Sequence, residues 1–259
     1  MKPRRKFYNG VINLDVRPHK NGTFRQQLIS VFQLETLNKN PHLKEMLLAC
    51  AVNCVFFIPF NFYFTHLGNW LIYDIGLTTG DMGLVEGIAL LLAALVTIPF
   101  AKIINSGKIP QVCFASVLIN SVGLLGISKF VTGPDSINTG NLFSFSNLHL
   151  FLFVFLVGVG YVLISQAATI WVKMLFPEEN RGALEGMKVI FFTLIPMFVG
   201  TLIGNYIIKH TPQPVPVYDI YGHVIDVPQE NLFGIAAVMV LLTLVPLYFG
   251  SKEYRKRVG

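Results

Sequence analysis

The chain has 259 residues, of which 53% are hydrophobic and only 13% are charged, and its formal net charge at pH 7 is +6. Soluble domains average about 25% charged residues, so this composition excludes an ordinary soluble protein. The positive charge does not indicate a nucleic-acid partner, because it lies in loops flanking apolar segments, where membrane orientation and anionic lipid account for it. We therefore expect membrane lipids, and no nucleic acid, among the partners.

Six apolar segments of about 20 residues make up most of the sequence, and each matches a hydrocarbon core about 30 Å thick. In chain order they are 46–66, 82–103, 111–130, 149–172, 189–208 and 232–250. A β-barrel would need strands of about 10 alternating residues, which these continuous apolar runs do not provide. The predicted fold class is therefore an all-α membrane protein, a bundle of six transmembrane helices.

The basic residues lie almost entirely on one side of these spans. Of the 20 Lys and Arg residues, all but Lys129 and Lys209 fall on that side. By the positive-inside bias the basic side is cytoplasmic, which predicts a multi-pass protein of the cell membrane with both termini in the cytoplasm. Residues 1–45 then form a cytoplasmic basic linker, 46–250 the six-helix domain and 251–259 a cytoplasmic basic tail.

Two segments outside the spans carry structural signals of their own. Residues 24–38 place apolar side chains at helical spacing between polar ones, which predicts an amphipathic helix on the membrane surface or against the bundle. The loop 210–231 holds four of the 14 prolines and is expected to form a short hairpin. No apolar stretch follows the basic N-terminus, so no cleavable signal peptide is predicted and the first span is expected to direct insertion.

Small residues inside the spans are expected to serve packing. Cys50, Cys54 and Cys113 have no His or Cys neighbours at metal-ligand spacing, so we expect neither a metal site nor a cofactor. Gly200 and Gly204 have the small-x-x-x-small spacing that allows close contact between helices.

Polar side chains inside the spans are costly in lipid, so they should face a cavity or another helix. The candidates for substrate binding are Asn53, Asn61, Asn120, Gln166 and Thr169. Asn53 and Asn61 are eight residues apart, a little over two helical turns, so they lie on roughly one face. Two amides there would bind sugar hydroxyls; interhelical hydrogen bonding, worth about 0.6–2 kcal/mol, is the alternative. Gln166 lies deep in its span with Ser165 and Thr169, which favours a cavity-lining position.

Glu86 is the one acidic residue within an apolar span. It lies five residues after Asp81 and one turn into its helix, so it either reaches water at the outer end or serves a proton relay or cation coupling. His66 and Trp70 fall near the outer interface, where interfacial anchoring and substrate gating are the two alternatives.

The inner loop PEENRGALEG, residues 177–186, resembles a pattern of the major facilitator superfamily. Members often carry P-x-x-x-R-G-x-x-x-G between their tenth and eleventh helices. The matching residues, which form the candidate gating loop, are Pro177, Arg181, Gly182 and Gly186. The topology is similar too, because six spans with both ends inside follow a long basic segment like the family's central loop.

A second inner turn resembles the family less closely. Of the motif G-x-x-x-D-x-x-G-R, usual between the eighth and ninth helices, only Gly107 and Lys108 remain as gating-turn candidates, and Ile104 stands at the acidic position. The resemblance therefore does not imply a charge-based latch here. The pair Glu185–Gly186 is similar to the glycoside–pentoside–hexuronide:cation symporters. Many of these place a lysine deep in the eleventh helix, whereas Lys188 lies at its inner edge.

The resemblance covers nearly the whole chain, as the carboxy-terminal half of a twelve-helix transporter. It implies a secondary transporter, or half of one, that moves a small polar solute such as a sugar by alternating access with ion coupling. The implied partners are the solute and an amino-terminal six-helix half or a second copy. In the symporter branch, cation coupling relies mostly on acidic residues of the amino-terminal half, which this sequence does not contain.

Other function classes remain as alternatives. The chain's start in a basic linker favours a fragment or split transporter, and a non-transporting scaffold or truncated remnant is the second hypothesis. A membrane enzyme is the third, but the sequence has no HExxH, Ser/His/Asp cluster or paired intramembrane carboxylates. We therefore expect no enzymatic activity. A nucleotide-driven pump and a channel are disfavoured, because neither a Walker sequence nor a repeated filter segment is present.

Overall fold

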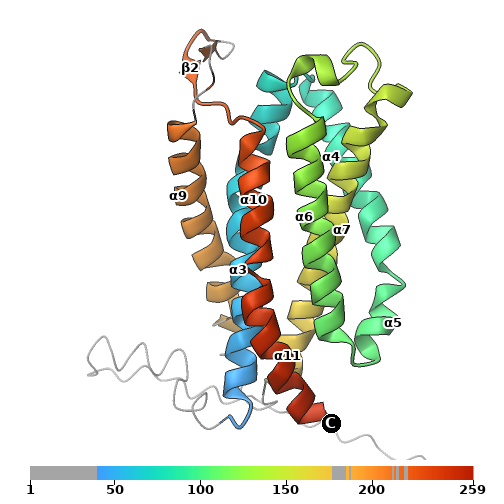
Figure 1. The fold of residues 1–259 in the computed structure, drawn as a ribbon, viewed down its shortest axis with the longest axis vertical. Coiled ribbons are helices and arrows are strands. Elements are labelled where there is room, and N and C mark those ends of the chain that lie inside the picture. Colours follow the sequence, from blue (N-terminus) through green and yellow to red (C-terminus); the bar gives the residue numbers. More distant parts are fainter. Residues whose placement is uncertain are drawn as a thin grey trace, which may run out of the picture.

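The computed structural model is an all-α bundle, as the sequence predicts. Its described part contains six helical spans that are long and apolar enough to cross a membrane. It describes residues 40–176, 185–186, 188–211, 213, 216–218 and 221–258. Figure 1 shows the spans side by side, with a small β-hairpin at one end, here called the hairpin end, and the C-terminus at the other, the C-terminal end. The predicted amphipathic segment 24–38 lies outside the described residues.

The six spans are built from helices and two π-helical turns. The first three spans are α3 (Leu43–Asn69) with the π-turn η1 (Trp70–Asp74), α4 (Thr79–Thr97) with α5 (Phe100–Asn105), and α6 (Ile109–Phe130). The last three are α7 (Leu148–Leu175), the π-turn η5 (Ile190–Leu194) with α9 (Ile195–His210), and α10 (Asn231–Leu241) with α11 (Leu244–Val258). The short 3-10 turns η2 (Pro134–Ser136) and η3 (Phe145–Asn147) precede α7.

Prolines explain why two of the predicted continuous spans are broken. A proline has no N–H to donate to the carbonyl four residues before it, and its ring clashes with that carbonyl. Pro99 follows the end of α4, and Pro246 lies just after the break at Leu242–Thr243 between α10 and α11. Beyond that break, α11 stays helical to Val258, so residues 251–258 of the predicted tail are helical and continuous with the last helix.

Two central helices hold the bundle together. α3 and α7 contact each other, α4 packs on α7, and α9 packs on α3. α6 packs on α7 and α10, and Figure 1 shows α6 and α10 in front, with α9 and α4 on opposite sides of the bundle. α4 and α9 are the least buried of the six spans. The two flanking helices thus leave much of their surface free for contact with lipid or another protein.

Glycines allow the tightest helix contacts. A Cβ at Gly160 of α7 would lie 2.5 Å from the Cβ of Asn120 on α6. A Cβ at Gly200 of α9 would lie 2.5 Å from the carbonyl oxygen of Ile58 on α3, and a Cβ at Gly204 would lie 2.8 Å from the Cβ of Phe62 on the same helix. The packing role expected for Gly200 and Gly204 is therefore confirmed.

Replacing Gly160 with alanine should destabilise the bundle, because the added methyl would also meet backbone atoms of α6 at 2.8 Å, which cannot move aside cheaply. Overpacking of this kind costs about 1–3 kcal/mol. The matched control is Gly87→Ala on α4, where no described atom lies within 4 Å of the new methyl. Unfolding of both variants in detergent should show a loss of stability for Gly160→Ala alone. Equal stability of the two variants would contradict the tight packing of Gly160 on α6.

The predicted hairpin is present in the loop 210–231. β1 (Val217–Tyr218) pairs antiparallel with β2 (Val224–Ile225). The Gln213 amide joins this loop to η1, at the end of the first span, by donating a hydrogen bond to Asp74 at 2.9 Å. It also donates a hydrogen bond to the Pro228 carbonyl at 3.2 Å. The hairpin is thereby fixed over the end of the first span.

Candidate functional site

A cavity of about 190 Å³ opens between α3, α4 and α7, in the half of the bundle nearer the hairpin end. We call it the Glu86 cavity, because Glu86 of α4 is the one charged side chain among its described lining residues. Its aromatic lining residues are Phe60, Tyr63, Phe64 and Tyr161. Pockets of this kind, mostly apolar with a few polar groups, are typical of small-molecule sites.

The cavity results from small residues beside large ones. Gly158 of α7 faces Ala89 and Ala93 of α4, and a Cβ at Gly158 would lie 3.3 Å from the Ala93 Cβ, so the two helices approach closely there. Above and beside this contact, the rings of Phe60 and Tyr161 stack with centroids 4.6 Å apart and planes 15° from parallel. The two stacked rings and Glu86 line the same space.

The Glu86 carboxylate lacks a partner in the described part of the chain. Glu86 is half-buried and makes no hydrogen bond or ion pair with any described residue. The Tyr63 hydroxyl is buried and lies next to the side chain of Asn120 on α6, with which it interacts. An unmade hydrogen bond of a buried group costs about 1–3 kcal/mol. Glu86 is therefore available to bind a polar molecule or an ion.

The two amides predicted on one face of the first span are not brought together in this cavity. Asn61 donates to the Phe57 carbonyl of its own helix at 2.7 Å, and its Cβ lies against Gly200 of α9. Asn53 is 1% exposed, and neither its Nδ2 nor its Oδ1 has a partner among the described residues. Eight residues turn a helix through two full turns and about 80°, which is enough to point the two side chains at different neighbours.

The other three predicted substrate residues also lie outside the Glu86 cavity lining. Asn120 is fully buried between α6 and α7, where its Nδ2 donates to the Val157 carbonyl at 3.0 Å, so it faces another helix. Gln166 is exposed, and it follows Tyr161 by five residues, which points it about 140° away around α7. Thr169 is half-buried and lies about two turns along α7 from Tyr161. Of the predicted site residues, Glu86 alone lines the cavity.

The aromatic residues near the hairpin end are buried more deeply than interfacial anchors. Trp70 is fully buried, and its ring lies 4.6 Å from that of Phe233 on α10. Trp70 therefore packs in the core and does not face lipid. His66 is half-buried beside Asn205 of α9.

The predicted gating residues that the structure describes lie at the C-terminal end. Pro177, Arg181 and Gly182 fall outside the described residues, and Gly186 is exposed. Gly107 turns the chain between α5 and α6 with a φ of 84°, a conformation that favours glycine. Its carbonyl accepts a hydrogen bond from the Tyr254 hydroxyl of α11 at 2.7 Å, and Lys108 beside it is exposed.

The residue at the family's acidic position in this turn is apolar and buried. Ile104 is only 2% exposed. The turn is therefore held by apolar packing and by the Tyr254 hydrogen bond.

A buried charged cluster, which was not predicted from the sequence, lies at the C-terminal end. Glu45 lies at the start of α3, and its side chain is only 3% exposed. Its carboxylate accepts a hydrogen bond from Nε1 of Trp171 at 2.8 Å. It also accepts hydrogen bonds from Nε and Nη2 of Arg257 at 2.8 and 3.1 Å. This Glu45 cluster joins α3, α7 and α11. Trp171 and Arg257 are 126 and 212 residues from Glu45 in the sequence, so no local pattern predicts these contacts. The one signal in the sequence was an isolated acidic residue at the start of an apolar span.

Comparison with known proteins gives one match. A family model described as the Major Facilitator Superfamily matches residues 26–258, which include all six spans. Neither the curated proteins nor the solved structures contain a match to this chain.

Proposed function

Because this chain belongs to the major facilitator superfamily and is a membrane transporter of that superfamily, we propose that it moves a small polar solute, a sugar, by alternating access with ion coupling. The proposed site is the Glu86 cavity. The observation that carries the proposal is the combination of stacked aromatic faces with the unpaired Glu86 carboxylate in one space between α3, α4 and α7.

The chemistry of this space suits a sugar. A sugar ring has an apolar face, which an aromatic ring such as that of Tyr161 covers, while Phe60 stacked behind it keeps that ring in place. Its hydroxyl groups need hydrogen-bond partners, and the Glu86 carboxylate offers acceptors without giving up a partner among the described residues. A carboxylate amid aromatic rings also suits an organic cation, which is the second candidate class of solute.

The same carboxylate supports ion coupling. An acidic side chain within a membrane span is costly unless it is protonated or paired with a cation, and such residues mark ion pathways. Glu86 has no cationic partner among the described residues. Protonation or cation binding would neutralise it, and solute binding next to it would then depend on the ion.

A six-helix bundle supplies one wall of a transport pathway, and transporters of this type bind their substrates between repeats near the membrane midplane. α4 and α9 expose large apolar side chains, including Leu91 and Leu95 on α4 and Met197 and Phe198 on α9. These surfaces suit contact with an amino-terminal six-helix half or with a second copy of the chain, which we propose as the partner.

The experiment is uptake of labelled hexoses, pentoses, disaccharides and organic cations into proteoliposomes, with the chain alone and with an amino-terminal six-helix half. We expect saturable uptake of a sugar, and Tyr161→Ala should reduce it by about tenfold, as expected for the loss of one well-placed aromatic contact.

The control for this variant is Phe145→Ala, which removes a ring that is 88% exposed outside the cavity and should leave uptake unchanged. Saturable uptake of an organic cation in place of a sugar would reassign the solute class. No uptake in either arrangement would favour the non-transporting scaffold.

A further inference from the structure

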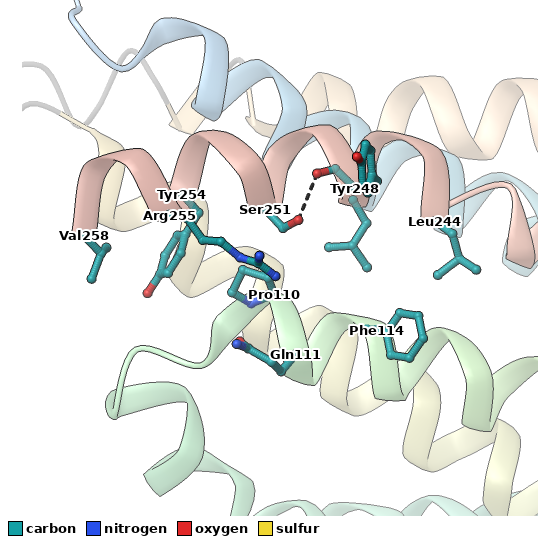
Figure 2. A pocket seen from close by; sticks show the side chains of 10 residues that line it. Pro110, Gln111, Phe114, Leu244, Tyr248, Ser251, Tyr254, Arg255 and Val258 are labelled. Atoms are coloured by element: carbon teal, nitrogen blue, oxygen red, sulfur yellow. Dashed lines mark hydrogen bonds between the residues drawn. The ribbon is translucent and has the colours of Figure 1, made fainter.

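A second, larger cavity of about 590 Å³ lies between α6 and α11 at the C-terminal end, far from the Glu86 cavity. We call it the α6–α11 groove. In Figure 2, side chains from one face of α11 point toward the first two turns of α6, where Pro110, Gln111 and Phe114 face them. The groove is too large to be a packing defect, and its volume is within the range of ligand pockets, about 300–1,000 Å³.

The break in the sixth span creates this groove. α10 packs closely along α6, whereas α11, beyond the break at Leu242–Thr243, contacts α6 far less. At the far end, the Tyr254 hydroxyl reaches the Gly107 carbonyl and bridges the two elements again. The result is a space bounded by α6, by α11 and by this hydrogen bond.

The walls of the groove are mainly apolar and continue onto an apolar surface. Phe114, Leu247 and Val258 face the groove. Along α6 beyond Phe114, the exposed apolar side chains on the same face of the helix include Leu118, Val122 and Leu125. A hydrocarbon chain entering the groove from the membrane along α6 would therefore remain in contact with these apolar side chains.

Arg255 is a charged residue that faces the groove without an ionic partner among the described residues. The neighbouring basic residues on α11 are paired, since Arg257 binds Glu45 and Lys256 binds Glu253. Arg255 makes no ion pair or hydrogen bond with any described residue, and Figure 2 shows its side chain extending over Pro110 into the groove. A guanidinium matches the geometry of a phosphate and binds it through two parallel hydrogen bonds.

We infer that the α6–α11 groove binds an anionic phospholipid, with its phosphate on Arg255 and an acyl chain between Phe114 and Leu247. The charge complements a phosphate, and the apolar walls complement hydrocarbon. A free anion would leave those walls bare, and a lipid without net charge would leave the excess positive charge of this end uncompensated. Lys108, exposed next to the groove residues at the start of α6, adds to the attraction for an anionic headgroup.

The test is native mass spectrometry of the full-length protein in detergent, titrated with dioleoylphosphatidylglycerol and separately with dioleoylphosphatidylcholine. Wild type should bind phosphatidylglycerol more tightly, and Arg255→Gln should weaken that binding by about tenfold, as expected for losing a charge-assisted contact. Ser251→Phe, which places a ring in the groove without changing charge, should weaken binding of both lipids. The matched control is Lys252→Gln, on the same helix but not lining the groove.

Three results would overturn the proposal. Equal weakening by Arg255→Gln and Lys252→Gln would show that only the overall charge of this end attracts lipid. Displacement of the lipid by glycerol 3-phosphate at equal concentration would reveal an anion site that makes no use of the apolar walls. Unchanged phosphatidylglycerol binding in both Arg255→Gln and Ser251→Phe would mean that another occupant, such as the chain's own amino-terminal segment, fills the groove.

Discussion

Replacing Glu45 with alanine should lower the free energy of unfolding by about 3–5 kcal/mol, the range observed when one partner of a buried ion pair is removed. The substitution leaves the Arg257 guanidinium, whose side chain is only 19% exposed, without its counter-charge. It also leaves the buried Nε1 of Trp171 without an acceptor. Since the Glu45 cluster joins α3, α7 and α11, we expect the loss to affect the cooperative unfolding of the whole bundle.

The measurement is unfolding of the purified protein in mixed detergent micelles, followed by circular dichroism. The control is Glu253→Ala, which removes a carboxylate that pairs with Lys44 and Lys256, whose side chains are 75% and 59% exposed. Exposed pairs contribute about 0–1 kcal/mol, so this variant should remain near wild type. If both variants lose the same stability, the burial of Glu45 has no special importance.

Glu86→Gln is expected to uncouple transport from its driving ion. The amide resembles the protonated carboxyl in shape but neither releases a proton nor attracts a cation, so solute binding no longer depends on the ion. Coupling free energies of about 1–3 kcal/mol correspond to changes in affinity of about 5- to 150-fold. The loss of coupling should therefore reduce ion-driven accumulation of the solute by a factor of about 5 to 150. Exchange of labelled for unlabelled solute, which needs no net ion movement, should persist.

Accumulation and exchange are measured in the same proteoliposomes under an imposed proton or sodium gradient. Asp81→Asn provides the control, because Asp81 lies on the same helix but binds Thr78 at the exposed start of α4. This variant should accumulate solute as wild type does. Accumulation by Glu86→Gln at the wild-type level would remove Glu86 from the coupling mechanism.

The spans were predictable because the cost of placing polar groups in lipid acts on every residue of a segment. The third span illustrates this, since the predicted 111–130 and the observed Ile109–Phe130 differ by two residues at one end. The breaks near Pro99 and Pro246 were not predicted, because apolar content continues through both prolines while the backbone hydrogen bonding does not.

The candidate site was less predictable than the spans. Glu86 stood out because an acid in an apolar segment is conspicuous in the sequence alone. The Tyr63 and Tyr161 side chains did not, since aromatic residues are common in every span and their convergence depends on how α3 and α7 pack. Asn120 was selected for its polarity, but its polar group is needed between two helices at a glycine contact, which sequence spacing does not show.

The central claim is that the transported solute occupies the Glu86 cavity. The most direct measurement is the rate of thiol alkylation at Phe64→Cys, a partly exposed cavity-lining position, with and without a saturating sugar from the uptake panel. The native cysteines Cys50, Cys54 and Cys113 are buried, so wild type supplies the background. We predict that the sugar slows alkylation of Phe64→Cys and not that of Phe145→Cys. Equal rates at Phe64→Cys with and without a sugar that the protein transports would contradict the assignment of the cavity.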